Sequence, residues 1–220
     1  MLNPFVRGGD SHSLVVGMVG TKMGERFVQI GCAHGGRLGA VAAKVGLSGR
    51  AVAITPDEAS AERARKGAAQ AGMLVDVEVA PVTALPVEDN AFDVAVVDDT
   101  GGLLGAIRPE DRGGLVGELL RILRPGGRVV ALGAVPPTGL GALLRRGPSE
   151  PTFAGSGALH ELLATGGFRP VRTLAERDSL IFVEAVKPRD SSRSEDSPSV
   201  AKKRQTRQES SVFAGKDRET

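Results

Sequence analysis

The sequence has very few aromatic residues and a single cysteine. Tryptophan and tyrosine are absent, and seven phenylalanines are the only aromatic side chains among 220 residues. Stacking of bases on an aromatic platform, which many single-strand binders use, is therefore disfavoured. Cys32 has no second cysteine to pair with. This excludes an internal disulfide framework and fits a reducing cytoplasm.

Long apolar runs and a strong excess of either charge are also lacking. No stretch approaches the roughly 20 apolar residues that a membrane helix needs, and the first residues contain no apolar leader segment. The 28 Lys and Arg residues nearly balance the 26 Asp and Glu residues, so the formal net charge is only +2. We therefore expect a cytoplasmic protein without a membrane partner, and nucleic acid is an unfavoured partner.

The composition changes near residue 188. Residues 188–220 are rich in Ser, Lys, Arg and Glu and have few apolar side chains. Such a segment buries too little surface to offset the entropy of ordering. The sequence therefore predicts two parts, a folded domain over residues 1–187 and a disordered polar tail over residues 188–220. The basic run 202–207 within this tail is interpreted as solvated.

Short apolar runs alternate with helical patterns through the folded part. The runs at 26–30, 49–55, 92–99 and 126–134 are typical of strands covered on both faces. The run 75–80 alternates valines with acids, which predicts an edge strand with one wet face. Two further strands over residues 171–186, turning at 177–179, form an antiparallel edge. The expected fold class is α/β, with a doubly wound seven-stranded sheet that is mostly parallel and has an antiparallel C-terminal strand.

Helices are predicted between these strands, at residues 11–23, 37–46, 56–71, 110–125 and 156–168. The third has the clearest signals, because Thr55 matches a helix cap and Pro56 suits the first helical position. The fourth is expected to stop at Pro125, which cannot continue a helix.

A glycine-rich segment follows the first apolar strand and opens the second helix. In an open parallel sheet, ligands bind outside the carboxyl ends of the strands, where this turn lies. Gly31 permits a sharp turn, and Cys32 and Ala33 are small enough for a ligand to approach the backbone. Gly35 and Gly36 keep the following helix close. Backbone amides at the start of that helix favour a carboxylate or a phosphate.

Four segments resemble the class I S-adenosylmethionine-dependent methyltransferases, namely FVQIGCAHGGRLG, LPVEDNAFDVAVVDD, LLRILRPGGRVV and ELLATGGFRPV. Members of this family typically show a Leu-Pro pair, a Phe-Asp pair that opens the fourth strand, and Arg-x-Leu-x-Pro-Gly-Gly before the fifth. This chain has them as Leu85-Pro86, Phe92-Asp93 and residues 121–127. The resemblance extends over roughly residues 11–186 and is nearest to the methyltransferases of small molecules. It implies a Rossmann-like fold.

The resemblance also implies a cofactor site at the carboxyl ends of the strands. The expected cofactor is S-adenosylmethionine, lying over the glycine loop, with its ribose near Thr55 and its adenine beside residues 81–83. The residues expected to contact it are Gln29, Gly31, Cys32, Ala33, Gly35, Thr55, Pro56, Pro81, Val82, Thr83 and Asp98.

Three acids that the family usually carries are replaced in this chain. Gln29 stands before the glycine loop, Thr55 ends the second strand and Pro81 follows the third. A charge-assisted hydrogen bond contributes roughly 1.5 to 3 kcal/mol, so the joint loss weakens cofactor binding unless other groups substitute. Gln29 keeps an acceptor, and Thr55 keeps one hydroxyl for a ribose. Whether Thr55 binds ribose or caps the helix is left open by the sequence.

The candidate catalytic residues are His34, Asp98 and Asp99. The resemblance places the residues after the fourth strand beside the methyl acceptor, where His34 and the two aspartates would form an acid–base group. Alternatively, the aspartates only cap a turn by accepting hydrogen bonds from nearby amides. Cys32 is interpreted as a small buried residue and not as a nucleophile. The three histidines show no metal-ligand spacing, so no metal site is expected.

Three functions are compatible with these patterns. The leading hypothesis is an S-adenosylmethionine-dependent methyltransferase that acts on a small molecule. The alternative, motivated by the three replaced acids, is a catalytically inactive methyltransferase-like module that binds a protein partner or supports assembly. A nicotinamide dinucleotide binder ranks last, because it requires an acid where Thr55 stands.

Overall fold

A computed structural model describes residues 9–135 and 157–189 of the chain. Its strands are β1 (Arg26–Ile30), β2 (Arg50–Thr55), β3 (Asp76–Val79), β4 (Phe92–Asp99), β5 (Leu123–Ala134), β6 (Val171–Arg177) and β7 (Leu180–Val186). Its helices are α1 (Gly9–Val19), α2 (Gly35–Val45), α3 (Glu58–Gln70), α4 (Leu103–Ala106), α5 (Arg112–Ile122) and α7 (Ala158–Thr165). A short 3-10 turn, η2 (Pro109–Asp111), precedes α5.

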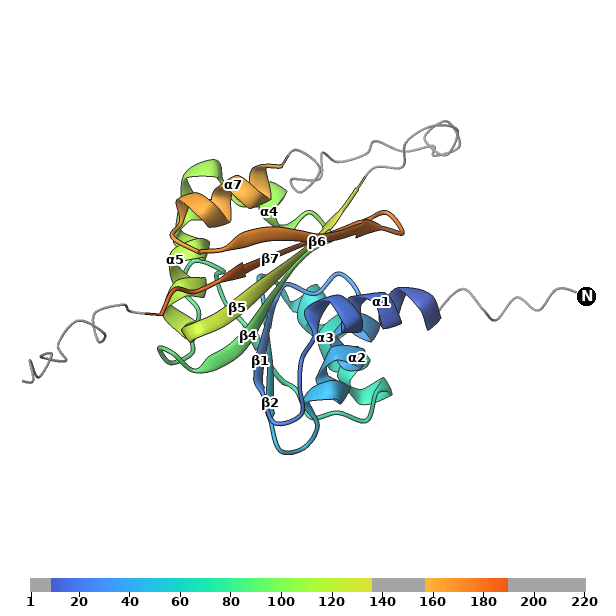
Figure 1. The fold of residues 1–220 in the computed structure, drawn as a ribbon. Helices are drawn as coiled ribbons and strands as arrows, with labels where there is room; N and C mark the ends of the chain where they lie inside the picture. The colour runs from blue at the N-terminus through green and yellow to red at the C-terminus, as the bar shows by residue number, and fades with distance from the viewer. Residues whose placement is uncertain (1–8, 136–156, 190–220) are drawn as a thin grey trace, which may run out of the picture. The chain divides into compact units, whose positions relative to one another are not determined.

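The strands form one seven-stranded sheet in the order β3-β2-β1-β4-β5-β7-β6 (Figure 1). Strands β1 to β5 pair in parallel, whereas β7 is antiparallel to both β5 and β6. The predicted fold class is therefore confirmed, as is the edge position of β3. The order reverses its direction between β1 and β4, and this reversal places the loops that follow these two strands side by side.

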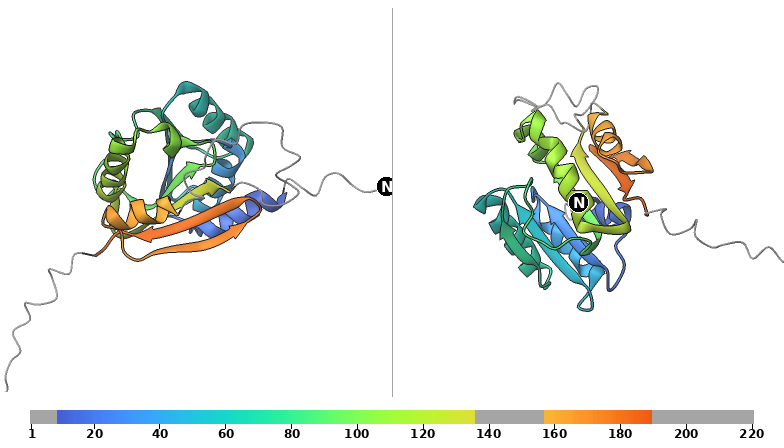
Figure 2. Two further views of the ribbon diagram at one scale, coloured as in Figure 1. Left: turned by 90° about the horizontal axis from the view of Figure 1, so that it is seen from above. Right: turned by 90° about the vertical axis from the view of Figure 1, so that its left-hand side faces the viewer.

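Two layers of helices cover the sheet, as Figure 2 shows. Helices α1, α2 and α3 lie on one face, where they pack on side chains such as Phe27, Val94 and Val96. Helices α4, α5 and α7 lie on the other face, over side chains that include Val28 and Ala95. Because successive side chains of a strand point to opposite faces, the uninterrupted apolar strands serve both cores.

The motifs that indicated the family act mainly as structural clamps. Arg121 lies in α5, and its Nη1 atom donates to the carbonyl oxygen of Val87 and to Asp89 Oδ1, at 2.7 Å in each case. Its Nη2 atom donates to the carbonyl oxygen of Leu85 at 2.9 Å and to Glu118 Oε2 at 2.8 Å. One guanidinium thus fixes the loop that leads into β4.

Asp93 joins two other segments in the same way. Its Oδ2 atom accepts from the backbone N of Arg26 at 2.6 Å, and its Oδ1 atom accepts from Arg124 Nε at 2.7 Å. The Phe-Asp and Arg-x-Leu-x-Pro-Gly-Gly motifs therefore tie the start of β4 to the starts of β1 and β5.

All five predicted helices differ from the observed ones by a few residues, and three of these differences have a clear cause. Helix α1 ends at Val19 because Gly20 adopts a φ of 59°. Helix α3 begins at Glu58, so Pro56 lies outside it. Helix α5 ends at Ile122, before Pro125, because Leu123 already pairs with β4 in the sheet. The first two boundaries follow from local backbone geometry, at Gly20 and at the Asp57 cap, whereas the end of α5 is set by a contact with β4.

Strands β3 and β6 form the two edges of the sheet. Strand β3 has only four residues. Strand β6 shifts its register between Thr173 and Ala175, and its exposed side chains include Arg172, Glu176 and Arg177. The turn that joins β6 to β7 has positive φ values at its two central residues, as a tight hairpin requires.

Several sequence predictions fall on other parts of the chain. Residues 136–156 and the predicted tail from residue 190 onward lie outside the described residues. The boundary at residue 187 stays a prediction. None of the helices in the described ranges has the length and apolar character needed to span a bilayer.

Candidate functional site

Gly31 makes the turn that opens the site at the end of β1. Its φ of 77° lies in the left-handed region that favours glycine. A Cβ atom at this position would lie 2.9 Å from Leu103 Cδ2 and 3.1 Å from the carbonyl oxygen of Asp98. The loop after β1 therefore passes so close to the loop after β4 that no side chain fits between them.

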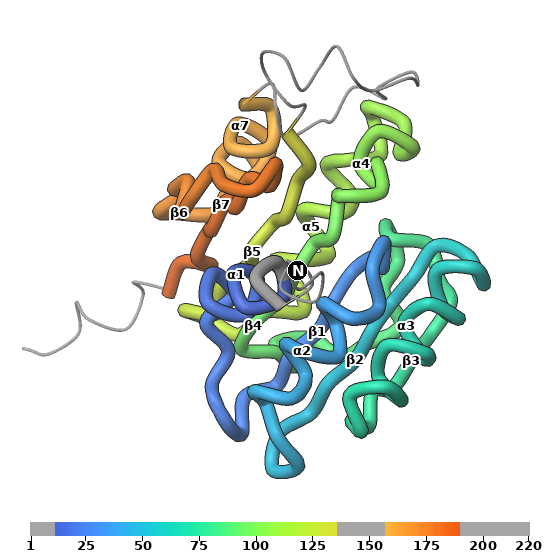
Figure 3. Tube along the Cα trace, turned by 90° about the vertical axis from the view of Figure 1, so that its right-hand side faces the viewer, coloured from blue at the N-terminus to red at the C-terminus, as the bar shows by residue number. Residues whose placement is uncertain are grey.

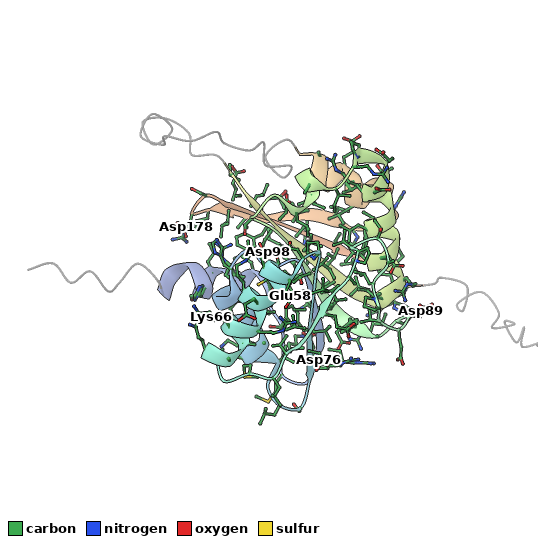
Figure 4. All side chains as sticks on the ribbon, turned by 180° about the vertical axis from the view of Figure 1, so that it is seen from behind. Glu58, Lys66, Asp76, Asp89, Asp98 and Asp178 are labelled. Carbon is green, nitrogen blue, oxygen red and sulfur yellow. The ribbon has the colours of Figure 1, made fainter. Side chains whose placement is uncertain are left out.

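Asp98, at the end of β4, holds these two loops together. Its Oδ2 atom accepts from the backbone N of Ala33 at 2.9 Å. Its Oδ1 atom accepts from the hydroxyl of Thr100 at 2.6 Å and from the backbone N of Thr100 at 3.2 Å. Figure 4 shows Asp98 at the carboxyl edge of the sheet, far from Asp76 at the amino edge. These bonds match the turn-capping alternative for Asp98.

Asp99 lies in a different environment from its neighbour. It is completely buried, and its Oδ1 atom accepts from the backbone N of Leu104 at 2.7 Å, at the start of α4. Its Oδ2 atom has no hydrogen-bond partner among the described residues. Burial raises the pKa of Asp99 to about 6, and the charge of Asp98 adds to the effect. Asp99 does not line either hollow described below.

A first hollow of about 180 Å³ opens beside the glycine loop. Its walls come from the loop after β1, the start of α3 and the loop after β4. The residues that line it are Gly31, Cys32, Ala33, Pro56, Asp57, Ser60, Arg63, Asp98, Gly101, Gly102, Leu103 and Ala106. Gly31, Cys32, Ala33, Pro56 and Asp98 were predicted from the sequence.

Two predicted contact residues point into the protein. Gln29 is 2% exposed, and its Nε2 atom donates to the carbonyl oxygen of Gly31 at 2.9 Å, so its side chain shapes the loop. Thr55 is completely buried, and its hydroxyl donates to the carbonyl oxygens of Asp57 at 3.2 Å and Glu78 at 3.4 Å. The prediction that Thr55 caps α3 is wrong, because Asp57 occupies the cap position.

Asp57 is a site residue that is not among the candidates predicted from the sequence. Its Oδ1 atom accepts from the backbone N of Ser60 at 2.8 Å, and its Oδ2 atom accepts from the hydroxyl of Ser60 at 3.1 Å. The backbone hydrogen bond is the main cause that lowers the pKa of Asp57, which is therefore ionised at neutral pH. The feature of the sequence that could have identified Asp57 is the presence of an acid two residues after the end of β2.

Arg63 is the second residue that sequence reasoning missed. Its Nε atom donates to the carbonyl oxygen of Cys32 at 3.0 Å, and its Nη2 atom donates to the hydroxyl of Ser60 at 2.6 Å. It reaches the loop because α3 packs very tightly on α2 at Gly35 and Gly67, where a Cβ atom would overlap the opposing backbone. The prediction that Gly35 allows close packing holds, although the neighbour is α3.

The segment 81–83, predicted beside the adenine, contributes nothing to the first hollow. Val82 is 6% exposed and belongs to the core under α5, whereas Pro81 and Thr83 are exposed. Their adenine contact stays a prediction.

A second hollow, of about 430 Å³, adjoins the first and shares Ala33 and Arg63 with it. It is lined by His12, Ala33, His34, Gly35, Gly36, Arg37 and Arg63. His34 thus lies in this hollow, whereas Asp98 lines the other, and no hydrogen bond between them occurs in the described part of the chain. The predicted acid–base group of His34, Asp98 and Asp99 is therefore not assembled in this conformation.

The Cys32 thiol is not activated as a nucleophile, and the described residues form no metal site. Burial is the main cause that raises the pKa of the Cys32 thiol to about 12, with a smaller contribution from Asp98. The thiolate, which is the nucleophilic form, is therefore not populated near neutral pH. Within residues 9–135 and 157–189, no group of His, Cys, Asp and Glu side chains could hold a metal ion.

The first hollow fits part of an adenosylmethionine. Its floor is backbone at Gly31, and its small side chains at Cys32 and Ala33 leave room for a ligand. The exposed Asp57 side chain also lines this hollow. The two adjoining hollows together have the size of a site for a small molecule, which is typically about 300–1,000 Å³.

Comparison with known proteins agrees with the architecture. Residues 27–127 match the family described as a methyltransferase domain. An uncharacterised 37.1 kDa protein in a transposon of Streptomyces fradiae is 31% identical over 118 residues, which are 54% of this chain and 32% of that protein. An uncharacterised protein of Mycobacterium tuberculosis is 29% identical over 116 residues, which are 53% of this chain and 39% of that protein. The chain thus matches only about a third of the length of these curated relatives.

Solved structures share the fold at low identity. An S-adenosylmethionine-dependent methyltransferase from Aquifex aeolicus superposes with a TM-score of 0.62 and 20% identity, covering 80% of this chain and 89% of that chain. An O-methyltransferase from Thermotoga maritima gives 0.59 and 17%, covering 86% and 66%. The cyclase SpnF, which carries out a 4+2 cyclisation, gives 0.60 and 20%, covering 82% and 80%. At these identities, the likeness concerns the fold alone.

Proposed function

We propose that this chain binds S-adenosylmethionine in the first hollow and methylates a small molecule, because residues 27–127 match the methyltransferase domain family and the sheet has the class I strand order. The position of Asp57 is the observation that carries this proposal. It supplies an ionised carboxylate at the carboxyl edge of β2, two residues after Thr55, which stands where the expected acid is missing.

Asp57 retains the capacity to bind a ribose while it caps α3. A carboxylate has about four lone-pair sites, and the two hydrogen bonds from Ser60 occupy one on each oxygen. The remaining sites accept hydrogen bonds from the vicinal hydroxyls of a ribose. Arg63 and Ser60 fix the helix start around this carboxylate, so the acceptor is held in place before the ligand arrives.

The rest of the site acts by positioning. The bound cofactor would supply an activated methyl group on a sulfonium. Gly31, Cys32 and Ala33 would hold its chain against the backbone, and Asp98 would keep their loop in place through its bond to Ala33 N. Alignment of donor and acceptor contributes a large part of the rate in such a displacement, so a dedicated nucleophile is not required.

A second candidate function is binding without turnover. It is favoured by the aspartates at the end of β4, because Asp98 holds the two loops together and Asp99 is buried and lines neither hollow. The cyclase among the similar folds also shows that this architecture is not restricted to methyl transfer.

Calorimetric titration with S-adenosylmethionine and S-adenosylhomocysteine tests the proposal. Asp57→Asn keeps the helix cap, since Asn caps as well as Asp does, but removes the charge that holds the ribose. We expect its affinity for both ligands to fall at least tenfold, as a lost charge-assisted hydrogen bond implies. Glu58→Gln is the matched control, because it removes the adjacent charge, which does not line the hollow, and it should bind as the wild type does.

Absence of binding to the folded wild-type protein would refute the cofactor site. Equal losses in Asp57→Asn and Glu58→Gln would show that overall charge, and not ribose contact, controls affinity. Transfer of a labelled methyl group to a panel of small acceptors separates the two functions, because a binding module retains the affinity and shows no transfer.

A further inference from the structure

The second hollow has an unusual charge for a protein whose overall charge nearly cancels. We call it the basic hollow and define it by His12, His34, Arg37 and Arg63. No Asp or Glu is among the residues that line it. A concave surface that presents cationic groups from several elements raises the local concentration of anions.

These four side chains converge from three helices. His12 comes from α1, His34 and Arg37 from the start of α2, and Arg63 from α3. Figure 3 shows α1 lying across α2, with α3 on its other side. Gly36 makes this convergence possible, because a Cβ atom there would lie 2.8 Å from the His12 Cε1 atom. The imidazole of His12 therefore rests directly on the beginning of α2.

The two arginines are held in place but keep donors for a ligand. Arg37 Nη1 donates to the hydroxyl of Thr100 at 3.0 Å. Arg63 uses its Nε and one Nη atom for Cys32 and Ser60. A guanidinium has five N–H donors, so these bonds leave several on each side chain. Both cations are thus oriented before a ligand binds, which favours recognition of a planar or tetrahedral oxyanion.

The start of α2 adds to the positive potential. His34 is its cap residue and makes no side-chain capping bond, and the first turn contains no acid. The first backbone N–H groups of a helix have no partner within the helix, and the macrodipole is positive at this end. Here the helix start supplements four basic side chains in a defined cavity.

We propose that the basic hollow binds the anionic group of the methyl acceptor, a carboxylate or a phosphate. This inference rests on the proposed function and deepens it, since it names the acceptor as an anionic small molecule. The basic hollow adjoins the first hollow at Ala33 and Arg63, so an acceptor anchored there reaches toward the adenosylmethionine site. The anchor then sets which molecules are aligned for transfer.

The titration of His34 gives an independent readout. Burial is the main cause that lowers the pKa of His34, and the charges of Arg37, His12 and Arg63 act in the same direction. Only Asp98 acts to raise it. A bound anion would favour the imidazolium and raise the pKa of His34, so binding should be accompanied by proton uptake at pH values between the pKa of the free and the bound protein.

The first experiment uses inorganic phosphate as the probe and the full chain. Proton NMR signals of the three histidines are followed during the titration. We expect the His12 and His34 signals to shift and saturate and the pKa of His34 to rise. His160 is an internal control, since its Nε2 atom lies 3.1 Å from the carbonyl oxygen of Val171, outside the hollow. Unmoved His12 and His34 signals would overturn the proposal.

Matched substitutions locate the binding. Arg37→Gln and Arg63→Gln should each weaken phosphate binding at least tenfold. Arg65→Gln removes the same charge from α3 at a residue that does not line the hollow, and it should change the affinity less than twofold. Equal effects in all three variants would indicate general charge attraction and overturn the proposal. If one arginine variant does not fold, the phosphate affinity of the other variant and the histidine signals of the wild-type protein together test the proposal.

Repeating the titration with saturating S-adenosylhomocysteine identifies the source of the anion. Phosphate that still binds, within about threefold of its affinity for the free protein, supports an acceptor site beside the cofactor. Competition between the two ligands would show that the hollow holds the cofactor's own carboxylate, which overturns the assignment to the acceptor. Failure of the proposed function is a separate outcome, because S-adenosylhomocysteine itself would then not bind to the protein.

Discussion

Gly35 and Gly67 bring the backbones of α2 and α3 into direct contact. A Cβ atom on Gly67 would overlap the carbonyl oxygen of Gly35, and one on Gly35 would lie 3.1 Å from the Cα atom of Gly67. This approach lets Arg63 reach the carbonyl oxygen of Cys32 and places Asp57 at the rim of the first hollow. The two glycines thus allow the close helix contact that positions Asp57 and Arg63.

Gly67→Ala should destabilise the protein by about 1–3 kcal/mol, because an added methyl group forces two closely packed helices apart. The affinity for S-adenosylhomocysteine should fall with it, since Asp57 and Arg63 move with α3. Chemical denaturation and calorimetry measure the two effects.

The matched control for this substitution is Gly117→Ala in α5. Nothing lies within 4 Å of a Cβ atom there, so the change should stabilise the helix by up to about 1 kcal/mol. A stabilised Gly67→Ala protein would contradict the proposed close contact.

The buried carboxyl of Asp99 should make stability depend on pH. Its pKa rises from 3.8 to about 6 on folding, so the unfolded chain loses this proton first as the pH rises. The stability contributed by the protonated carboxyl is complete below pH 3.8 and is lost by the time the pH passes about 6. Since one pKa unit corresponds to 1.36 kcal/mol, the loss amounts to about 3 kcal/mol.

Asp99→Asn removes this titration and keeps an acceptor for the backbone N of Leu104. The variant should therefore gain about 2 kcal/mol relative to the wild type between about pH 4.5 and pH 7.5. Urea unfolding at a series of pH values measures the difference. Asp178→Asn is an exposed control, and a constant difference between Asp99→Asn and the wild type across this range would refute the burial argument.

Arg121→Lys should destabilise the protein by about 2–3 kcal/mol. Lysine is a single point donor and cannot replace the forked contacts with Glu118 and the loop carbonyls. Arg124→Lys, in the same motif, loses one contact to Asp93 on a side chain that is 59% exposed and should cost less than about 1 kcal/mol. Equal losses measured by thermal unfolding would show that the motif does not act through the Arg121 clamp.

The strands could be predicted because their signals are local. The runs at 26–30 and 92–99 match β1 and β4 residue by residue, because a continuous apolar stretch bounded by loops leaves little choice in where the strand begins and ends. The end of α5 could not be predicted in the same way. Pro125 is a strong local stop, but pairing of Leu123 with Phe92 ends the helix earlier, and this contact joins distant parts of the chain.

The glycine loop of the site was predictable, whereas the residues opposite it were not. Gly31, Cys32 and Ala33 follow directly from a strand-to-helix turn. Arg63 enters the site only through the contact between α2 and α3, which no local pattern records. Thr55 shows the converse, because its position in the sequence suggested a ribose, but its hydroxyl is used by two backbone carbonyls inside the protein.

The two borders of the sheet also bear on how the protein behaves at high concentration. An unpaired strand offers a row of free amides and carbonyls on which another chain can polymerise. Here one border is only four residues long, and the other combines a break in register with the charged side chains of Arg172, Glu176 and Arg177. Neither border is a flat, apolar template, so the fold resists growth into fibrils by strand addition at its margins.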